Sequence, residues 1–351
     1  MSDMNRLPVI GLSFLLTSPW LAEVSATQAP SRTIDLENIG YQHVPCSFPT
    51  RGQDAYDKRQ VEFLDDKHLL IHFATPDSCG PARYRRGKPG IHSAVIDVFG
   101  KVIHTYDWQS GEDVTAGPDG KILIFRLTDV QVVDLNFQTV KTISWRQDGY
   151  PYVVVTPSRH GFAIVDRDHS SLFTGASFRE TATASGAIAA AGDNGFVTVT
   201  GGDPDPLVLH VNGIKWETPK HSSFARFFDA GSVELFMLDP KFNLYRINQS
   251  GDEALVASLG WLAPGMRNSG FRFDLALPEA NRVLLYSHGA RIAFSDTSGI
   301  WTYFRTAMLD LRTGKTLFQW DGKIGDDVSL SPNGHIVAVR QNGRLALYEI
   351  P

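Results

Sequence analysis

The sequence predicts an all-β protein built from repeated four-stranded antiparallel sheets, on three observations. The 351 residues include 31 Gly, 19 Pro, 21 Phe, 10 Tyr and 7 Trp, a composition typical of many short strands and tight turns. Beyond residue 58, short β-type runs alternate with turn residues, and the apolar periodicity of helices is nearly absent. The same order of strands and turns also recurs along the chain, so the units must stack around a common axis to bury both sheet faces.

The first segment, residues 1–26, is predicted to be an export signal. An apolar stretch over residues 7–21 follows Arg6, and Val24-Ser25-Ala26 supplies the small residues of a cleavage site. Two prolines in this stretch argue against a buried core helix. We therefore expect cleavage after Ala26 and a single domain over residues 27–351. No later stretch reaches the ~20 apolar residues of a membrane span, so we expect a monomeric periplasmic or secreted protein without a transmembrane segment.

The charge balance argues against binding to nucleic acid. The chain has 33 basic and 38 acidic residues and a net charge of −5, which argues against a general polyanion binder. Apolar residues make up 42% and charged residues 20%, so the chain can bury a core and wholesale disorder is excluded.

The two cysteines, Cys46 and Cys79, are expected to form a disulfide, because export places them where disulfides persist. The two cysteines are 33 residues apart in the sequence. For a disulfide that closes a loop of this length, the chain-entropy model gives roughly 3 to 4 kcal/mol of stabilisation. Two free thiols or a metal site are the alternatives, although only His43 and His72 lie close in the sequence as further ligands.

The clearest repeat unit spans residues 114–145. It contains four strand-like segments, VTAGPDG, KILIFRL, VQVVDLN and TVKTISW, in the order of a four-stranded meander. Further units begin near residues 61, 151, 187, 224 and 271, and the C-terminus repeats three segments as VSLSPNG, HIVAVRQ and NGRLALYEI. Tryptophans mark the ends of units, in or just after the fourth strand: Trp108, Trp145, Trp216, Trp261 and Trp320. The chain therefore holds six complete units and a seventh with three strands.

An incomplete last sheet leaves an open edge, so we expect a segment near the other terminus to complete it. Residues 32–37 have the required alternation and follow the predicted cleavage site. In this arrangement the chain resembles the seven-bladed β-propellers of the WD40, YVTN and quinoprotein-like group. The resemblance covers about residues 32–350 and rests on the order of strands, the SPNG and GPDG turns and the segment MLDLRTGKTLFQW. No Gly-His to Trp-Asp pair occurs, which departs from a true WD40 repeat, and a large β-sandwich is the alternative architecture.

The resemblance implies that the loops joining strands two and three share one face with the links between blades. Two long loops, residues 76–91 and 287–303, fall on that face in the first and sixth blades. Cys46 lies in the link entering the first blade, so both cysteines are expected on the same face. We place the interaction surface on blades six, seven and one, because long loops on a rigid scaffold are where binding residues concentrate.

The candidate binding residues come from these two loops. The first carries four positive charges in six residues beside an aromatic ring: Arg83, Tyr84, Arg85, Arg86 and Lys88. Guanidinium groups at this density can hold a carboxylate, a phosphate or a sulfated sugar, although a charged solvated loop is the plain alternative. The second carries polar and aromatic residues suited to a sugar or peptide: His288, Arg291, Asp296, Trp301 and Tyr303. Trp301 could equally be a core residue.

Four aspartates and one histidine mark the corresponding loops of blades three and four: Asp166, Asp168, His169, Asp203 and Asp205. They are weak metal candidates, because Asp-Pro-Asp-Pro at residues 203–206 is first a turn sequence. No cofactor is expected. The Gly-x-Ser-x-Gly and His-Glu-x-x-His motifs of common enzymes are absent from the sequence, and no Gly-Lys-Thr phosphate loop appears, because Gly314-Lys315-Thr316 lacks the preceding glycine of the Gly-x-x-x-x-Gly-Lys-Thr pattern. His72, His104 and His210 lie within β runs and are interpreted as packed or edge residues.

These observations favour an exported propeller scaffold that binds a protein or glycan through its loop-rich face. The alternative is a propeller hydrolase or lactonase-like enzyme with its site on the same face, which needs a general base and an electrophile that converge there.

Overall fold

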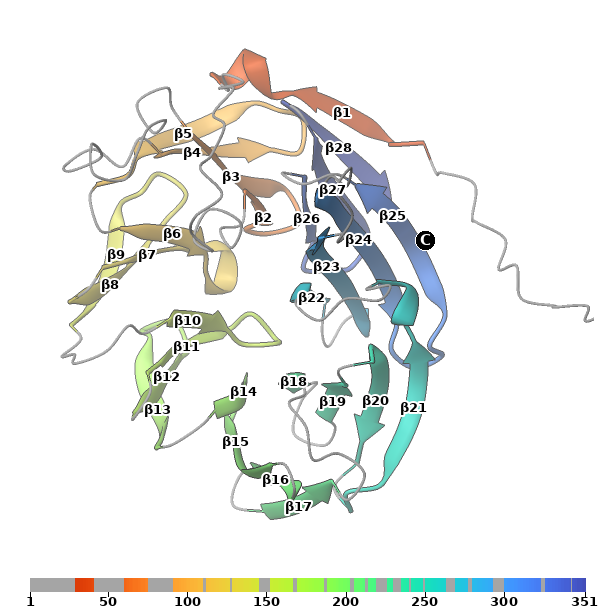
Figure 1. Cartoon of the computed structure of the whole chain (residues 1–351). Helices are drawn as coiled ribbons and strands as arrows, with labels where there is room; N and C mark the ends of the chain where they lie inside the picture. The colour runs from red at the N-terminus through yellow and green to blue at the C-terminus, as the bar shows by residue number, and fades with distance from the viewer. Residues whose placement is uncertain are drawn as a thin grey trace, which may run out of the picture.

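A computed structural model shows a ring of four-stranded β-sheets (Figure 1). The structure describes residues 29–40, 60–74, 91–109, 112–126, 128–144, 152–166, 169–185, 188–202, 205–211, 214–218, 226–229, 235–239, 241–248, 250–262, 269–276, 280–292, 300–322, 326–341 and 343–351. Within this part, all strand pairs are antiparallel, and the strands form seven sheets of four strands each. The predicted all-β propeller with four-stranded antiparallel blades is confirmed.

The first three blades follow one another along the chain. Blade 1 contains β2 (Val61–Phe63), β3 (His68–Ala74), β4 (Ile91–Asp97) and β5 (Val102–Asp107). Blade 2 contains β6 (Asp113–Ala116), β7 (Ile122–Phe125), β8 (Asp129–Val133) and β9 (Thr139–Ser144). Blade 3 contains β10 (Tyr152–Val155), β11 (Gly161–Val165), β12 (Ser170–Thr174) and β13 (Arg179–Ala184).

Three further blades continue the ring. Blade 4 contains β14 (Ile188–Gly192), β15 (Gly195–Gly202), β16 (Asp205–Val211) and β17 (Ile214–Thr218). Blade 5 contains β18 (Arg226–Asp229), β19 (Leu235–Leu238), β20 (Asn243–Ile247) and β21 (Glu253–Ser258). Blade 6 contains β22 (Ser269–Ala276), β23 (Arg282–Ile292), β24 (Ile300–Asp310) and β25 (Thr316–Gly322).

The last blade joins the two ends of the chain, as the sequence predicted. Blade 7 contains β26 (Asp327–Leu330), β27 (Ile336–Gln341), β28 (Arg344–Glu349) and the N-terminal strand β1 (Arg32–Asp35). Strand β1 pairs with β28 from Arg32 opposite Leu347 to Asp35 opposite Arg344, and Figure 1 shows it as the outer strand. The Arg32 Nη1 atom also donates to the Val98 carbonyl of blade 1 at 2.8 Å, so this strand ties blade 7 to blade 1.

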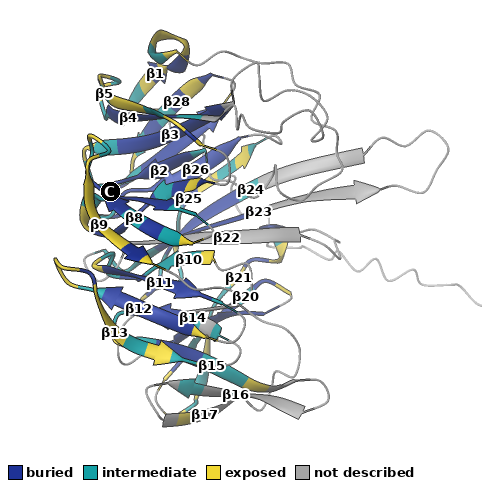
Figure 2. Ribbon diagram, turned by 90° about the vertical axis from the view of Figure 1, so that its left-hand side faces the viewer, coloured by how far each residue is buried: buried dark blue, intermediate teal, exposed yellow. Residues whose placement is uncertain are grey.

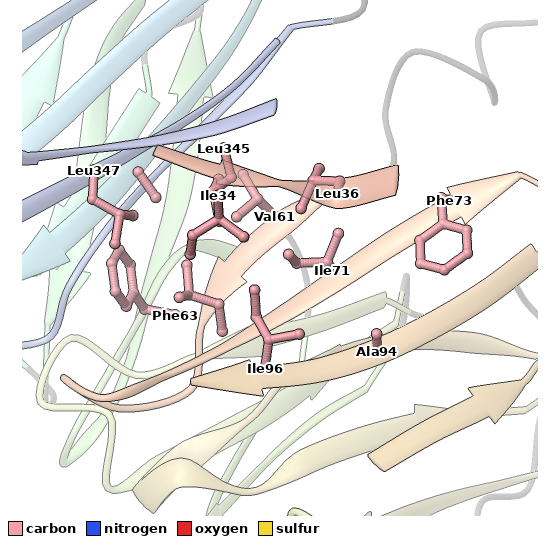
Figure 3. Close-up of a cluster of buried hydrophobic side chains, with 12 residues drawn as sticks. Ile34, Leu36, Val61, Phe63, Ile71, Phe73, Ala94, Ile96, Leu345 and Leu347 are labelled. Atoms are coloured by element: carbon pink, nitrogen blue, oxygen red, sulfur yellow. The ribbon is translucent and has the colours of Figure 1, made fainter. Parts of the chain in front are cut away.

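The hydrophobic core lies between neighbouring blades, because each sheet buries both of its faces. One cluster joins Ile34, Leu345 and Leu347 of blade 7 to Phe63 and Ile71 of blade 1 (Figure 3). Another joins Leu70 and Val95 of blade 1 to Ile122 and Ile124 of blade 2. Figure 2 shows the buried residues running along the strands. Full burial of such side chains contributes roughly 1.5 to 3 kcal/mol each, so the ring is held mainly by these clusters.

Antiparallel pairing gives the ring two distinct faces. Turns between strands two and three, together with the links between blades, lie on one face, which we call the loop face. Turns between strands one and two, and between strands three and four, lie on the opposite face, which we call the turn face. Three of the described turns carry phenylalanine in the left-handed region, where glycine is usual: Phe137, Phe178 and Phe242. Phe178 is buried, so packing of its ring offsets the backbone strain.

Two further findings concern the expected loops and membrane segments. The expected loop over residues 287–303 is wrong for most of its length, because β23 runs to Ile292 and β24 begins at Ile300. β-branched and aromatic residues at the second end of this stretch, Ile300 to Tyr303, favour continued pairing. No helix in the described ranges is long and apolar enough to cross a membrane.

Candidate functional site

The predicted binding residues fall into two groups. Those outside the described residues are Arg83, Tyr84, Arg85, Arg86, Lys88, Asp296, Asp168 and Asp203, together with both cysteines of the predicted disulfide, Cys46 and Cys79. The remaining residues of the blade 6 group lie in strands. His288 and Arg291 belong to β23, and Trp301 and Tyr303 belong to β24.

The register of blade 6 brings part of this group together. Arg291 lies opposite Trp301, and Gly289 lies opposite Tyr303, which places Arg291, Trp301 and Tyr303 on one face of the β23–β24 ribbon. His288 lies opposite Phe304 and belongs to the other face. Strand β22 pairs with β23 only as far as Gly289, and β25 pairs with β24 only as far as Phe304. The ribbon therefore extends beyond its two neighbouring strands on the loop face.

The weak metal candidates show turn contacts. The Asp166 N–H donates to the His169 carbonyl at 3.3 Å, and the His169 Nε2 atom lies 3.3 Å from the Ser171 hydroxyl. Asp205 is the first residue of β16. Among the residues that the structure describes, no group of three His, Cys, Asp or Glu side chains could hold a metal ion.

A buried polar network lies where the basic loop of blade 1 leaves and rejoins the sheet. It links the side chains of five residues, which we call the loop-one base: Glu62, His72, Ser93, Trp108 and Thr115. They come from the four strands of blade 1, with Trp108 directly after β5, and from β6 of blade 2. The first four are at most 5% exposed.

The distances in the loop-one base define a continuous chain of contacts. The Trp108 Nε1 atom donates to the Ser93 Oγ atom at 2.5 Å, and the same oxygen lies 2.7 Å from the His72 Nδ1 atom. The His72 Nε2 atom faces the Glu62 carboxylate at 3.6 Å. The Thr115 hydroxyl donates to the same carboxylate at 2.9 Å. The chain therefore crosses the whole of blade 1 and reaches blade 2.

A second buried network lies beside the loop-one base on the loop face. The Glu112 side chain is 1% exposed, and it accepts hydrogen bonds from the Tyr106 hydroxyl at 2.9 Å and the Gln109 N–H at 2.7 Å. The Arg126 guanidinium donates to the other carboxylate oxygen through Nε and Nη2. Burial, followed by the hydrogen bond to Glu112, raises the pKa of Tyr106 to about 12. The hydrogen bond to Glu112 is also the main cause that raises the Arg126 pKa.

A partly buried histidine contacts an exposed carboxylate close to the start of β4. His92 is the second residue of β4, and its Nδ1 atom makes a short contact with the carboxylate of Asp107 at the end of β5. The Asp107 side chain is 85% exposed, so it is open to solvent on the loop face. The His92 ring also packs against Phe73 with centroids 5.0 Å apart.

The loop-one base contains the residue types of a serine hydrolase triad, but its geometry does not serve that chemistry. Ser93 is fully buried, and the Trp108 indole N–H already occupies its hydroxyl oxygen. A nucleophilic serine must reach a substrate carbonyl, and in this conformation Ser93 cannot. The arrangement instead makes a rigid internal support. The sequence interpretation of His72 as a packed residue is confirmed, and His104 lies on the outer strand β5.

Sequence reasoning missed the loop-one base as a unit. Its members are spread over residues 62–115, four of them in separate strands and Trp108 directly after β5, so no local motif connects them. One signal was available. Glu62, His72 and Ser93 are polar residues within otherwise apolar strands, and a buried polar side chain in a sheet requires a partner.

Side chains of blade 7 bind the backbone of blade 1 on the inner side of the ring. The Asp327 Oδ2 atom accepts from the Gln60 N–H at 2.5 Å and the Val61 N–H at 3.0 Å. The Ser329 hydroxyl oxygen accepts from the Phe63 N–H at 3.1 Å. The Arg340 guanidinium donates to the Gln60 side chain. These hydrogen bonds provide acceptors for the backbone N–H groups at the edge of the innermost strand β2. The charged side chains of Asp327 and Arg340 therefore stabilise the contact between blades 7 and 1.

Comparisons with known proteins give matches among solved structures. No family model matches the chain, and no curated protein matches it. Among solved structures, the chain is similar to Hsv2 of Kluyveromyces lactis, with a TM-score of 0.43 and 10% identity over 84% of this chain and 98% of that chain. The same values of TM-score and identity hold for Hsv2 with its loop 6CD replaced by a Gly-Ser linker, over 84% and 99%. The WD40 domain of Neurospora crassa Pan2 is similar with a TM-score of 0.45 and 7% identity over 85% and 90%. These similarities concern the fold alone.

Proposed function

We propose that this protein is an exported β-propeller scaffold that binds a protein or glycan partner through the loop face of blades 6, 7 and 1. The observation that carries the proposal is the loop-one base. Two networks with buried carboxylates, centred on Glu62 and Glu112, fix the strand ends around a loop that carries four positive charges in six residues. Fixed strand ends on both sides of a charged segment favour binding, because they lower the conformational entropy that the segment loses when it binds a partner.

The extended ribbon of blade 6 supports the same face. Its register places Arg291 opposite Trp301 and Gly289 opposite Tyr303. Arg, Trp and Tyr are the residue types that concentrate binding energy at protein interfaces. Blade 7 packs against blade 6, and its inner strand is bonded to blade 1. The partner class that fits both elements carries carboxylate, phosphate or sulfate groups beside flat apolar surface.

The export part of the proposal rests on the leader-like residues 1–26 and on the spacing of β1. Strand β1 begins at Arg32, six residues after the proposed cleavage position at Ala26, so removal of the leader leaves the closing strand intact. A periplasmic or secreted location would also permit the proposed disulfide between Cys46 and Cys79.

The test is site-specific photo-cross-linking in cells that express the protein with its leader. Benzoylphenylalanine replaces Tyr84 in the basic loop, and in a matched control it replaces Lys67, an exposed residue in the turn between β2 and β3 on the turn face. We expect a defined partner adduct from position 84 and none from position 67. The adduct should disappear when Arg83, Arg85 and Arg86 are changed to Ala. Equal adducts from both positions, or an adduct that survives the triple substitution, would refute the proposed site.

A further inference from the structure

We propose that the outer edge of β24 over residues 300–303 is a strand-addition site, which pairs with an extended segment of a partner polypeptide. This inference rests on the proposed function, because the site lies on the same loop face and specifies a polypeptide as the partner. Two observations carry it. No described strand pairs with the backbone at this edge, and its sequence lacks the charged residues that protect the other outer edges.

The first observation is the point at which pairing stops on the outer side of β24. Strand β24 pairs with β23 along its whole length without a register shift. On its other side, β24 pairs with β25 from Leu309 to Phe304. Among the described residues, no strand continues this second ladder from Tyr303 to Ile300. This part of β24 therefore has one paired edge and one open edge.

The hydrogen bonds at the other end of β24 show which residues face the open edge. The Leu311 N–H donates toward β23, to the carbonyl of Asn281 directly before that strand, at 2.9 Å. The Asp310 N–H donates to the other side, to the carbonyl of the residue directly before β25, at 3.0 Å. In an antiparallel ladder this direction alternates with each residue, so odd-numbered residues of β24 bond to β23 and even-numbered residues face β25. The N–H and C=O groups of Ile300 and Thr302 therefore face the open edge.

The second observation is the composition of the open edge. Natural proteins protect an outer strand from unwanted pairing with charged residues or proline. Residues 300–303, Ile-Trp-Thr-Tyr, contain no charge and no proline, and all four are types that favour strands. In contrast, each of the seven outermost strands of the blades contains a charged residue: Arg32 of β1, Asp107 of β5, Lys141 of β9, Arg179 of β13, Lys215 of β17, Glu253 of β21 and Asp321 of β25. The open edge of β24 is therefore unprotected where the outer edges of the ring are protected.

These observations favour a polypeptide over a glycan as the partner. The open edge presents one donor and one acceptor on each of Ile300 and Thr302, at the spacing of a strand, and a chain of peptide groups repeats that spacing. Because the edge is uncharged, the segment that fits it is uncharged and rich in β-branched or aromatic residues, which pair well across strands. A third strand would also stabilise the ribbon, since a two-stranded hairpin is marginally stable in water. Loss of one hydrogen bond of this ladder should weaken binding by about tenfold.

The test uses cells that express the full chain with its leader and with benzoylphenylalanine in place of Tyr303. The matched control position is Phe99, which is 71% exposed in the turn between β4 and β5 on the turn face. We expect a polypeptide adduct from position 303 and none from position 99. In dilute extract, Thr302→Pro removes the outward N–H and should lower the adduct yield about tenfold, whereas Thr302→Val retains it and should leave the yield unchanged. If Thr302→Pro does not fold, Ile300→Pro removes the other outward N–H at the first residue of β24, where proline is tolerated.

Amide exchange measured by NMR tests the direction of the backbone groups. In the free protein, the N–H groups of Ile300 and Thr302 should exchange faster than those of Trp301 and Tyr303, because the latter two bond to β23. A synthetic peptide with the sequence of the cross-linked segment should then slow exchange at Ile300 and Thr302 by about tenfold. Capture of a polypeptide supports the inference only together with this protection and with the loss caused by proline.

The outcomes separate this inference from the proposed function. An adduct from position 303 that survives the proline substitutions, or slow exchange at Thr302 in the free protein, overturns the assignment of the open edge. An adduct with a glycan or with a second copy of the chain overturns the choice of partner. An adduct from position 84 with none from position 303 overturns this inference and leaves the proposed function intact. Absence of adducts from both positions refutes the proposed function, and this inference with it.

Discussion

Removal of the Asp327 carboxylate should weaken the inner contact between blades 7 and 1. Asp327 is 5% exposed, and its Oδ2 atom accepts from the N–H groups of Gln60 and Val61 at 2.5 and 3.0 Å. Asp327→Ala leaves both donors without this acceptor at a buried strand edge. An unsatisfied buried donor costs about 1 to 3 kcal/mol, so the substitution should lower the free energy of unfolding by about 2 to 5 kcal/mol.

The matched variants are Asp327→Asn and Ser329→Ala. Asparagine retains a carbonyl oxygen for one donor and should cost less than alanine. Ser329→Ala removes the acceptor of a single N–H, that of Phe63 at 3.1 Å, and should cost about 1 to 3 kcal/mol. Guanidinium chloride unfolding followed by tryptophan fluorescence measures all three. A loss below about 1 kcal/mol for Asp327→Ala would refute the view that these side chains satisfy the edge of β2.

Two further predictions concern a turn and a network. Phe178→Gly removes the backbone strain of a residue at φ 46°, which should raise the free energy of unfolding by about 1 to 2 kcal/mol. It also removes a ring that is 4% exposed, which should lower the free energy of unfolding by about 3 to 5 kcal/mol, so the variant should be less stable than the wild type. A variant as stable as the wild type would contradict this prediction. Tyr106 has a folded-state pKa raised from 10.0 to about 12, so its contribution to stability should be complete below pH 10 and lost as the pH rises through 12. The free energy of unfolding, measured between pH 10 and 12, should fall less in Tyr106→Phe than in the wild type. Equal falls in the two proteins would contradict this prediction.

The repeat of strands and turns was enough to predict the propeller, because each blade uses local alternation and turn residues. The units expected from residues 61, 114 and 151 correspond to blades 1, 2 and 3, and the segment at residues 32–37 contains the closing strand β1. The boundaries failed where a pattern was ambiguous. Residues 287–303 mix apolar and polar types without a turn signal at either end, so pairing continued where a loop was expected.

The candidate site was less accessible to sequence reasoning than the fold. Charge density and an aromatic neighbour identified the basic loop, because these are properties of adjacent residues. The Glu112 network and the loop-one base depend on which strands become neighbours, and that information is tertiary. Trp108 illustrates the difference. The sequence marked it as the end of a repeat unit, but its indole donor meets Ser93 only because β4 and β5 pair.

Strand β2, which has three residues, contributes both to the contact that closes the ring and to the loop-one base. The N–H groups of Val61 and Phe63 bind Asp327 and Ser329 of blade 7, and their side chains belong to the apolar cluster between blades 7 and 1. Glu62 lies between them, and because side chains alternate along a strand it faces Thr115 of blade 2 and ends the chain from Trp108. A displacement of β2 at its blade 7 edge would therefore move Glu62 as well. The His72 N–H also donates to the carbonyl of Gln60, whose own N–H is bound by Asp327. For this reason, the Asp327→Ala variant should also raise amide exchange at residues 72–74 and 91–93.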